Sequence, residues 1–178
     1  MHWRRSSTER YDGPVKVLVS DTSVLIDIER AALLERLFAL PHTLVVPDLL
    51  YVRELENWNG PELVRLGLVV EELSGPEVAA ATALGRAERS LSAPDTFAYI
   101  LARARGWTLL TGDGALRRRA FAERLPMHGA LWLFDEMDAH GVCPRPQLHE
   151  GLTVLSNHPR CRLPRTEILR RLRAYVIV

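Results

Sequence analysis

Short apolar segments alternate with helical patterns along most of this chain. The segments Val15–Ser20, Thr43–Val46, Leu68–Leu73 and Trp107–Leu110 consist mostly of apolar residues, and "PMHG" at residues 126–129 is expected to hold a very short fifth segment of this kind. Strands that are apolar on both faces are typical of a parallel sheet covered by helices on both sides. The pattern therefore predicts an α/β fold with a mainly parallel sheet of about four to five strands.

Helical patterns fill the intervals between these strands. Ser23–Leu40 has the spacing of one or two helices, and "NWNGPE" at residues 57–62 is expected to be a break. Gly106 is expected to end a helix, because glycine readily adopts the left-handed conformation found at such ends. The other predicted helices are Pro47–Asn57, Glu77–Arg89, Pro94–Arg105, Ala115–Arg124, Ala130–Ala139, Gln147–Leu155 and Arg165–Tyr175.

The formal net charge is only +1, so no overall basic field points to nucleic acid. Arginine carries nearly all of the positive charge, since Lys16 is the only lysine. Guanidinium groups suit phosphate geometry, but runs of charge are commonly just solvated. We expect a solvated face for the arginines of the predicted final helix, Arg165–Tyr175, and both interpretations stay open for Arg117–Arg119.

The two cysteines, Cys143 and Cys161, form neither a metal-type pair nor a disulfide framework, so we expect free thiols in a reducing compartment. Residues 1–13 contain no apolar segment typical of a signal peptide. No apolar run is long enough to span a bilayer. These observations predict a cytoplasmic protein with no membrane partner.

Acidic side chains lie where the predicted strands end. Asp21 directly follows the first strand, Asp113 follows the fourth, and Asp95 lies in the first turn of the helix before that fourth strand. Ligands bind outside the carboxyl ends of the strands in open α/β sheets. If the first and fourth strands are neighbours, these acids and Glu54, in the helix after the second strand, converge at one edge of the sheet.

Each acid alone also has a structural explanation. Asp21 and Asp113 are suited to cap helices or turns, and Asp95 is suited to complement a helix dipole. Glu54 has the properties of a surface residue, and helical spacing does not separate it from its neighbours. The competing neighbours are Glu56 and Asp48.

Taken together, four ionised carboxylates require a cation. Two unit charges ~4 Å apart repel by roughly 4 kcal/mol at an effective dielectric constant of about 20. Oxygen ligands alone select Mg²⁺ or Mn²⁺, and such ions serve phosphoryl chemistry. None of the six histidines has convincing ligand spacing, and His128 is expected to be a structural residue at a strand end.

Four stretches resemble the PIN-domain family, the ribonuclease fold of VapC-type toxins. They are "VLVSDTSVLID", "VVPDLLYVRELE", "SAPDTFAYILARARGWTLLTGDGALRRRA" and "MHGALWLFDEMDAHGV", and the resemblance runs from Val15 to about Gly141. The family's four metal-binding acids fall on Asp21, Glu54, Asp95 and Asp113. Its hydroxyl at the last turn falls on Thr111, which is expected to support the site without touching the metal.

The resemblance implies a three-layer PIN-like fold for residues 14–142 and a metal-dependent ribonuclease with Mg²⁺ or Mn²⁺ at the four acids. The implied partners are RNA, an antitoxin protein and a second copy of the chain in a homodimer. Arg117, Arg118 and Arg119 are expected to hold the substrate backbone. Residues 1–13 are expected to form a flexible arm, and residues 143–178 extra helices that pack on the same domain.

Other functions are compatible with parts of this pattern. Phosphoaspartyl enzymes fit poorly, because haloacid-dehalogenase phosphatases need an aspartate where Ser23 stands. Receiver domains need a lysine after the last strand, whereas Lys16 precedes the first. A PIN nuclease that processes RNA without an antitoxin remains open. So does a silent PIN-like module that binds RNA or protein, although such a module has no need to collect four like charges.

Overall fold

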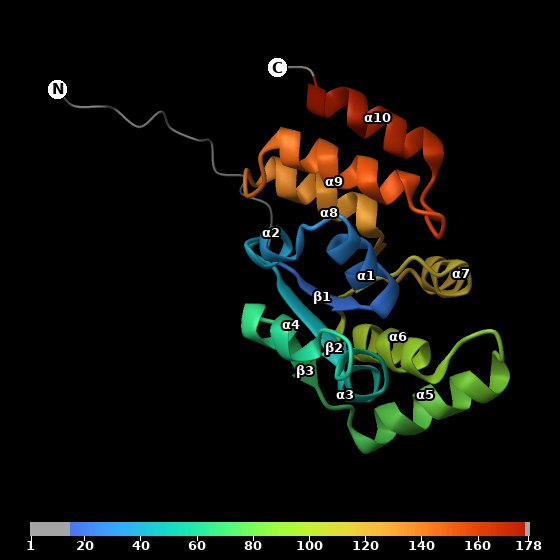
Figure 1. Cartoon of the computed structure of the whole chain (residues 1–178). Coiled ribbons are helices and arrows are strands. Elements are labelled where there is room, and N and C mark those ends of the chain that lie inside the picture. The colour runs from blue at the N-terminus through green and yellow to red at the C-terminus, as the bar shows by residue number, and fades with distance from the viewer. Residues whose placement is uncertain (1–14, 177–178) are drawn as a thin grey trace.

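The computed structural model describes residues 15–176, and its centre is a sheet of five parallel strands (Figure 1). The strands are β1 (Val17–Ser20), β2 (Thr43–Pro47), β3 (Val69–Glu71), β4 (Thr108–Leu110) and β5 (Met127–His128). Their order is β3-β2-β1-β4-β5, and every neighbouring pair is parallel. The predicted parallel sheet is confirmed, including its short fifth strand. The arm predicted for residues 1–13 lies outside the described residues.

The first and fourth strands are neighbours. Val19 of β1 pairs with Val45 of β2 on one side and with Leu109 of β4 on the other. Directly after β1, the Asp21 N–H donates to the Leu110 carbonyl oxygen at 3.0 Å. The carboxyl ends of β1 and β4 therefore meet at the point where the chain order reverses, which is where open α/β sheets bind ligands.

Helices cover both faces of the sheet and complete a three-layer fold (Figure 1). They are α1 (Thr22–Arg30), α2 (Leu34–Phe38), α3 (Asp48–Leu50), α4 (Gly60–Leu66), α5 (Gly75–Ala87), α6 (Ala93–Arg105), α7 (Gly114–Ala122), α8 (Ala130–Ala139), α9 (Arg145–Asn157) and α10 (Arg165–Val176). On one face α6 packs on β1, β2 and β4, and α5 packs on α6. On the other face α1 packs against α8 and α9, with α10 outermost on α9.

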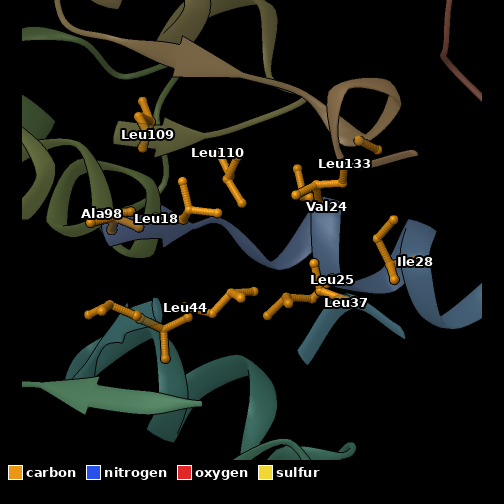
Figure 2. Packing of buried hydrophobic residues seen from close by; sticks show 14 of the residues in the cluster. Leu18, Val24, Leu25, Ile28, Leu37, Leu44, Ala98, Leu109, Leu110 and Leu133 are labelled. Atoms are coloured by element: carbon orange, nitrogen blue, oxygen red, sulfur yellow. The ribbon is translucent and has the colours of Figure 1, made fainter. Parts of the chain in front are cut away.

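One apolar core joins the sheet to the helices on both faces. Figure 2 shows Leu18 of β1, Val24 of α1 and Leu133 of α8 within this cluster, and each is fully or almost fully buried. Burying a side chain of this size stabilises the fold by roughly 1.5–3 kcal/mol. Because the core holds both β1 and α1, it fixes Asp21, which stands between them.

The C-terminal helices share this core. Leu152 of α9 and Tyr175 of α10 belong to the same buried cluster. The buried guanidinium of Arg171 in α10 donates from Nε to Asp135 Oδ1 in α8 at 2.8 Å. These contacts join α9 and α10 to the core of the sheet, while the division of the chain at residue 142 stays a prediction.

The segment after β2 differs from the predicted single helix Pro47–Asn57. It is the short α3 followed by one π-helical turn, Tyr51–Leu55. The break predicted at residues 57–62 is confirmed for residues 57–59, which form a turn, but it is shorter than predicted because α4 begins at Gly60. Pro61 suits the first turn of a helix, and glycine is required before it because a Cβ on Gly60 would lie 2.8 Å from the Leu55 carbonyl oxygen.

The segment Ser23–Leu40 forms two helices, α1 and α2. Ala32 interrupts them with a positive φ of 56°, a conformation that costs free energy for residues with a Cβ. Cys143 and Cys161 are free thiols, as predicted. Within residues 15–176, no helix combines the length and the apolar character needed to cross a membrane.

Candidate functional site

Asp21 occupies the turn between β1 and α1. Its Oδ1 accepts hydrogen bonds from the Val24 N–H at 3.0 Å and the Ser23 hydroxyl at 2.8 Å, so it caps α1. Its Oδ2 accepts from the Gly112 N–H at 3.3 Å. The capping interpretation is confirmed, and the contact with Gly112 also ties Asp21 to the segment that follows β4.

The Asp21 carboxyl is buried in a setting that opposes its ionisation, since only 3% of the residue is exposed. Burial raises the pKa of Asp21 above its ordinary value, against the hydrogen bonds from Thr111, Val24 and Ser23. The nearby charge of Asp95 raises this pKa further. A cation beside Asp21 would lower the pKa again, because it favours the ionised carboxylate.

Asp113 stands at the corresponding turn between β4 and α7. Its Oδ1 accepts from the Ala115 and Leu116 N–H groups, both at 2.9 Å, so it caps α7. Its own N–H donates to the Thr111 hydroxyl at 3.0 Å. The fully buried Thr111 side chain also lowers the pKa of Asp21, so it stands near both aspartates.

Asp95 lies in the first turn of α6 and forms a reciprocal capping box with Ser92. Its Oδ2 accepts from the Ser92 hydroxyl at 2.7 Å and from the Ser92 N–H at 3.1 Å. The Asp95 N–H donates to the Ser92 hydroxyl at 3.2 Å. A structural role for Asp95 is therefore confirmed, and its charge also acts on Asp21 across the edge of the sheet.

Glu54 contacts the residue beside Asp21. The hydroxyl of Thr22, the first residue of α1, donates to Glu54 Oε2. Among the described residues, neither Glu56 nor Asp48 has a hydrogen bond to this turn; Asp48 Oδ1 accepts from its neighbour, the Leu49 N–H, at 2.7 Å. This contact favours Glu54 over its two competitors as the fourth acid of the edge.

The four acids gather around the carboxyl ends of β1 and β4, but each is engaged in local hydrogen bonds. Asp113, Asp95 and Glu54 each use one identified carboxylate oxygen in these bonds. Within residues 15–176, no three of the four bring ligand atoms within 4.8 Å of one another. The four carboxylates therefore lie around one edge of the sheet, each holding its own hydrogen bonds, and do not form a closed coordination shell. We call this edge, which carries Asp21, Glu54, Asp95 and Asp113, the acid edge.

A different cluster does meet that distance, and the sequence analysis missed it. Ligand atoms of His42, Glu136 and His140 all lie within 4.8 Å of one another, close enough to hold a metal ion. The Lys16 N–H donates to His42 Nδ1 at 3.3 Å, so the ring proton is on Nε2, which lies 2.8 Å from Glu136 Oε2. Hydrogen bonds therefore account for the buried His42 and Glu136, and the half-buried His140 places its Nε2 3.3 Å from the same Glu136 Oε2. Only the i,i+4 spacing of Glu136 and His140 is visible in the sequence.

The three predicted substrate-binding arginines have different surroundings. Arg119 pairs with Glu88 and with Glu123 at 2.9 Å, so its charge is compensated. Arg117 donates from Nη1 to the Thr111 carbonyl oxygen at 3.2 Å, which holds it beside the acid edge. Arg118 is exposed. The geometry thus separates Arg117 and Arg118, which face the edge or solvent, from the ion-paired Arg119.

A sequence model of the DUF3368 family, which is described as a PIN domain, matches residues 17–175. The match includes all four acids and continues through α9 and into α10, beyond the point near Gly141 where the resemblance was expected to end. No curated protein and no solved structure matches the chain.

Proposed function

The chain belongs to the DUF3368 family of PIN domains, and because this membership indicates a nuclease, we propose that it is a metal-dependent ribonuclease that hydrolyses RNA phosphodiester bonds. One observation carries the proposal. The buried carboxyl of Asp21 is destabilised in its ionised form by burial and by Asp95, and its hydrogen bond from the Gly112 N–H ties it to the turn that carries Asp113. A cation is the simplest partner that would make such a group of like charges favourable.

The donor set fits Mg²⁺ or Mn²⁺. All four proposed ligands, Asp21, Glu54, Asp95 and Asp113, offer carboxylate oxygen, which these hard ions prefer. When bound, such an ion activates water and stabilises charge on the phosphate oxygens. The fit rests on the chemistry of the side chains and on the burial of Asp21.

The local hydrogen bonds position these ligands. The caps use Oδ1 of Asp113 and Oδ2 of Asp95, and Thr22 holds Oε2 of Glu54. Each side chain is thereby restricted to one rotamer, and its other oxygen is the one we assign to the ion. Such supporting contacts commonly change metal affinity or activity by about 10–100-fold when they are removed.

The first test is cleavage of end-labelled structured RNA with Mg²⁺ or Mn²⁺. We expect cleavage with either ion, loss of cleavage when EDTA removes it, and recovery when the ion is restored. Cleavage that persists in EDTA would contradict metal dependence. A folded, metal-supplied protein that leaves a broad panel of RNAs intact would contradict the nuclease and favour a silent binding module.

Glu54 and Glu56 form a matched pair for identifying the fourth acid. We expect Glu54→Gln to lower the cleavage rate by more than about tenfold, because it removes a charged ligand beside Asp21. Glu56→Gln, also exposed, should change the rate by no more than about twofold. Both variants should melt like the wild type. Equal losses in the two variants, or a loss in Glu56→Gln alone, would reject the assignment of Glu54.

The toxin role is a narrower proposal that rests on the resemblance to VapC-type proteins. It includes an antitoxin partner and a homodimer. Growth arrest on expression of the wild type, absent for an inactive variant and relieved by the product of an adjacent reading frame, would support it. A nuclease that processes RNA without an antitoxin would give cleavage without this relief.

A further inference from the structure

Two neighbouring cavities open beside the acid edge. The first, of about 580 Å³, lies between α1 and the connection from α9 to α10, and it reaches Gly112 and Asp113. The second, of about 410 Å³, reaches Thr111, His128 and Trp132. Both are lined by Asp27, Gly112, Arg162 and Leu163, so the two cavities lie side by side along α1. We call the two together the α1/α10 groove.

The outer wall of the groove is the α9–α10 connection, residues 159–164. Arg160 lines the first cavity and Arg162 lines both, and each is an exposed residue. Arg160 and Arg162 belong to an arginine-rich stretch of the kind that is commonly just solvated. The fold instead turns them toward α1, because α9 packs on α1 and brings the connection back to the edge of the sheet.

Charge in the groove is only partly compensated. Arg30 pairs with Asp27 at 3.5 Å, and the buried Arg171 pairs with Glu167 at 2.9 Å. Among the described residues, Arg160 and Arg162 take part in no ion pair with an acidic side chain. His128 adds no positive charge, because burial and then the charge of Lys16 lower its pKa. Arg117, which lines the second cavity, has no acidic partner among residues 15–176 either. The groove therefore presents three guanidinium groups without an acidic partner, and two of them, Arg160 and Arg162, line the first cavity together with Asp113.

From this geometry we propose that the α1/α10 groove binds the backbone of single-stranded RNA, with Arg160 and Arg162 contacting its phosphates. The inference rests on the proposed ribonuclease function and names the surface that would hold the strand next to the acid edge. Guanidinium groups pair with phosphate in a bidentate manner. Cavities of this volume accommodate small ligands such as single nucleotide units, so an unpaired strand suits the groove better than a duplex.

An acidic protein segment is the competing occupant, because it too would pair with arginine. The position of the groove favours RNA, since it begins at Gly112 and Asp113, where a phosphodiester must lie in the proposed reaction. A strand held at the acids must extend past them on one side, and on the side of the groove it meets Arg160 and Arg162, which have no acidic partner.

The test measures binding of a short fluorescein-labelled oligouridylate to the full chain in EDTA, where the proposed cleavage cannot occur. We expect Arg160→Ala and Arg162→Ala each to weaken binding by about tenfold, as for one lost charge-assisted contact. The slope of log affinity against log salt concentration should fall by about 0.7 for each lost phosphate contact. Arg173→Ala is the matched control, because Arg173 is exposed on α10 and lines neither cavity.

The outcomes separate the groove from the nuclease. If the wild type cleaves RNA but both groove variants bind RNA as tightly as the wild type, the proposed role of the groove is wrong and the proposed ribonuclease function still stands. If the groove variants lose affinity for a labelled oligoglutamate peptide but not for RNA, the groove binds protein instead. Equal losses in Arg173→Ala would show a general charge effect and would also overturn the proposal.

Discussion

Asp21→Asn is expected to abolish RNA cleavage and, at the same time, to raise the melting temperature of the metal-free protein. Loss of a metal ligand should reduce the cleavage rate by more than about 100-fold, beyond the range seen for supporting residues. The fold should survive, because asparagine caps helices as well as aspartate does. The asparagine amide oxygen can replace Oδ1 as the acceptor for the Val24 N–H and the Ser23 hydroxyl. The weaker hydrogen bond from the Gly112 N–H to Oδ2 would be lost, because an NH2 group stands there instead.

The stability gain follows from the direction of the Asp21 pKa. This pKa is raised in the folded protein above the ordinary value of 3.8, mainly by burial. A raised pKa means that the protonated carboxyl stabilises the fold, fully below about pH 3.8 and progressively less as the pH rises through the folded-state value. Ionisation of Asp21 at higher pH therefore destabilises the metal-free fold, and a neutral amide removes that effect.

Thermal melting in EDTA across a pH series checks this expectation. The melting temperature of Asp21→Asn should exceed that of the wild type at neutral pH, and the difference should shrink as the solution is acidified. Added Mg²⁺ should stabilise the wild type by mass action and the variant much less. Asp48→Asn is the control, because within residues 15–176 the Asp48 carboxylate bonds only its neighbouring backbone N–H, so this variant should retain cleavage.

Two results would count against this role for Asp21. A variant that cleaves normally and melts like the wild type would reduce Asp21 to a helix cap. A variant that unfolds would make the residue structural and leave the proposed metal centre without its most buried ligand. Either result would leave Glu54, Asp95 and Asp113 as the remaining candidate metal ligands.

The acid edge was predictable because its parts are local. An apolar strand followed by a capping aspartate places Asp21 at a carboxyl end, and the same holds for Asp113 after β4. The sequence could not show that β1 and β4 are neighbours, and that pairing brings the two turns together. The contact between Glu54 and Thr22 likewise depends on how the π-helical turn is oriented.

Features formed by residues far apart in the sequence could not be predicted from local patterns. His42 and Glu136 are 94 positions apart, and nothing near either one signals their hydrogen bond. Arg160 and Arg162 stand in a charged stretch that is normally solvated, and they line a groove only because α9 packs on α1. Local patterns thus located the carboxylates, while tertiary packing decided what lies beside them.

That packing gives the second large expected effect, a loss of stability in Gly151→Ala. Gly151 is buried in α9, and a Cβ there would lie 2.7 Å from the Ala31 carbonyl oxygen and 3.1 Å from Leu33 Cδ1. The closer obstacle is backbone and cannot rotate away, so α9 must move from the α1–α2 connection. Overpacking costs about 1–3 kcal/mol, and we expect a net loss of about 2 kcal/mol after the gain from a better helix-forming residue.

Gly85→Ala is the matched control for this variant. Gly85 lies inside α5, and its added Cβ would meet only Thr96 Cγ2 at 3.7 Å and Oγ1 at 3.9 Å, which are ordinary contacts. This control should gain about 0.5–1 kcal/mol, because alanine loses less backbone entropy than glycine in a helix. The two substitutions add the same methyl group, so opposite signs in their free energies of unfolding isolate the contact of α9.

Thermal and urea unfolding followed by circular dichroism measure both variants. For a chain of this length, a loss of 1 kcal/mol lowers the melting temperature by about 2–4 °C. If residues 143–178 are integral to the domain, Gly151→Ala should lower one cooperative transition. A separate early transition, with the main one unchanged, would mean that α9 and α10 detach on their own. Because those helices carry the wall of the α1/α10 groove, the variant should then also lose RNA affinity before it loses its fold.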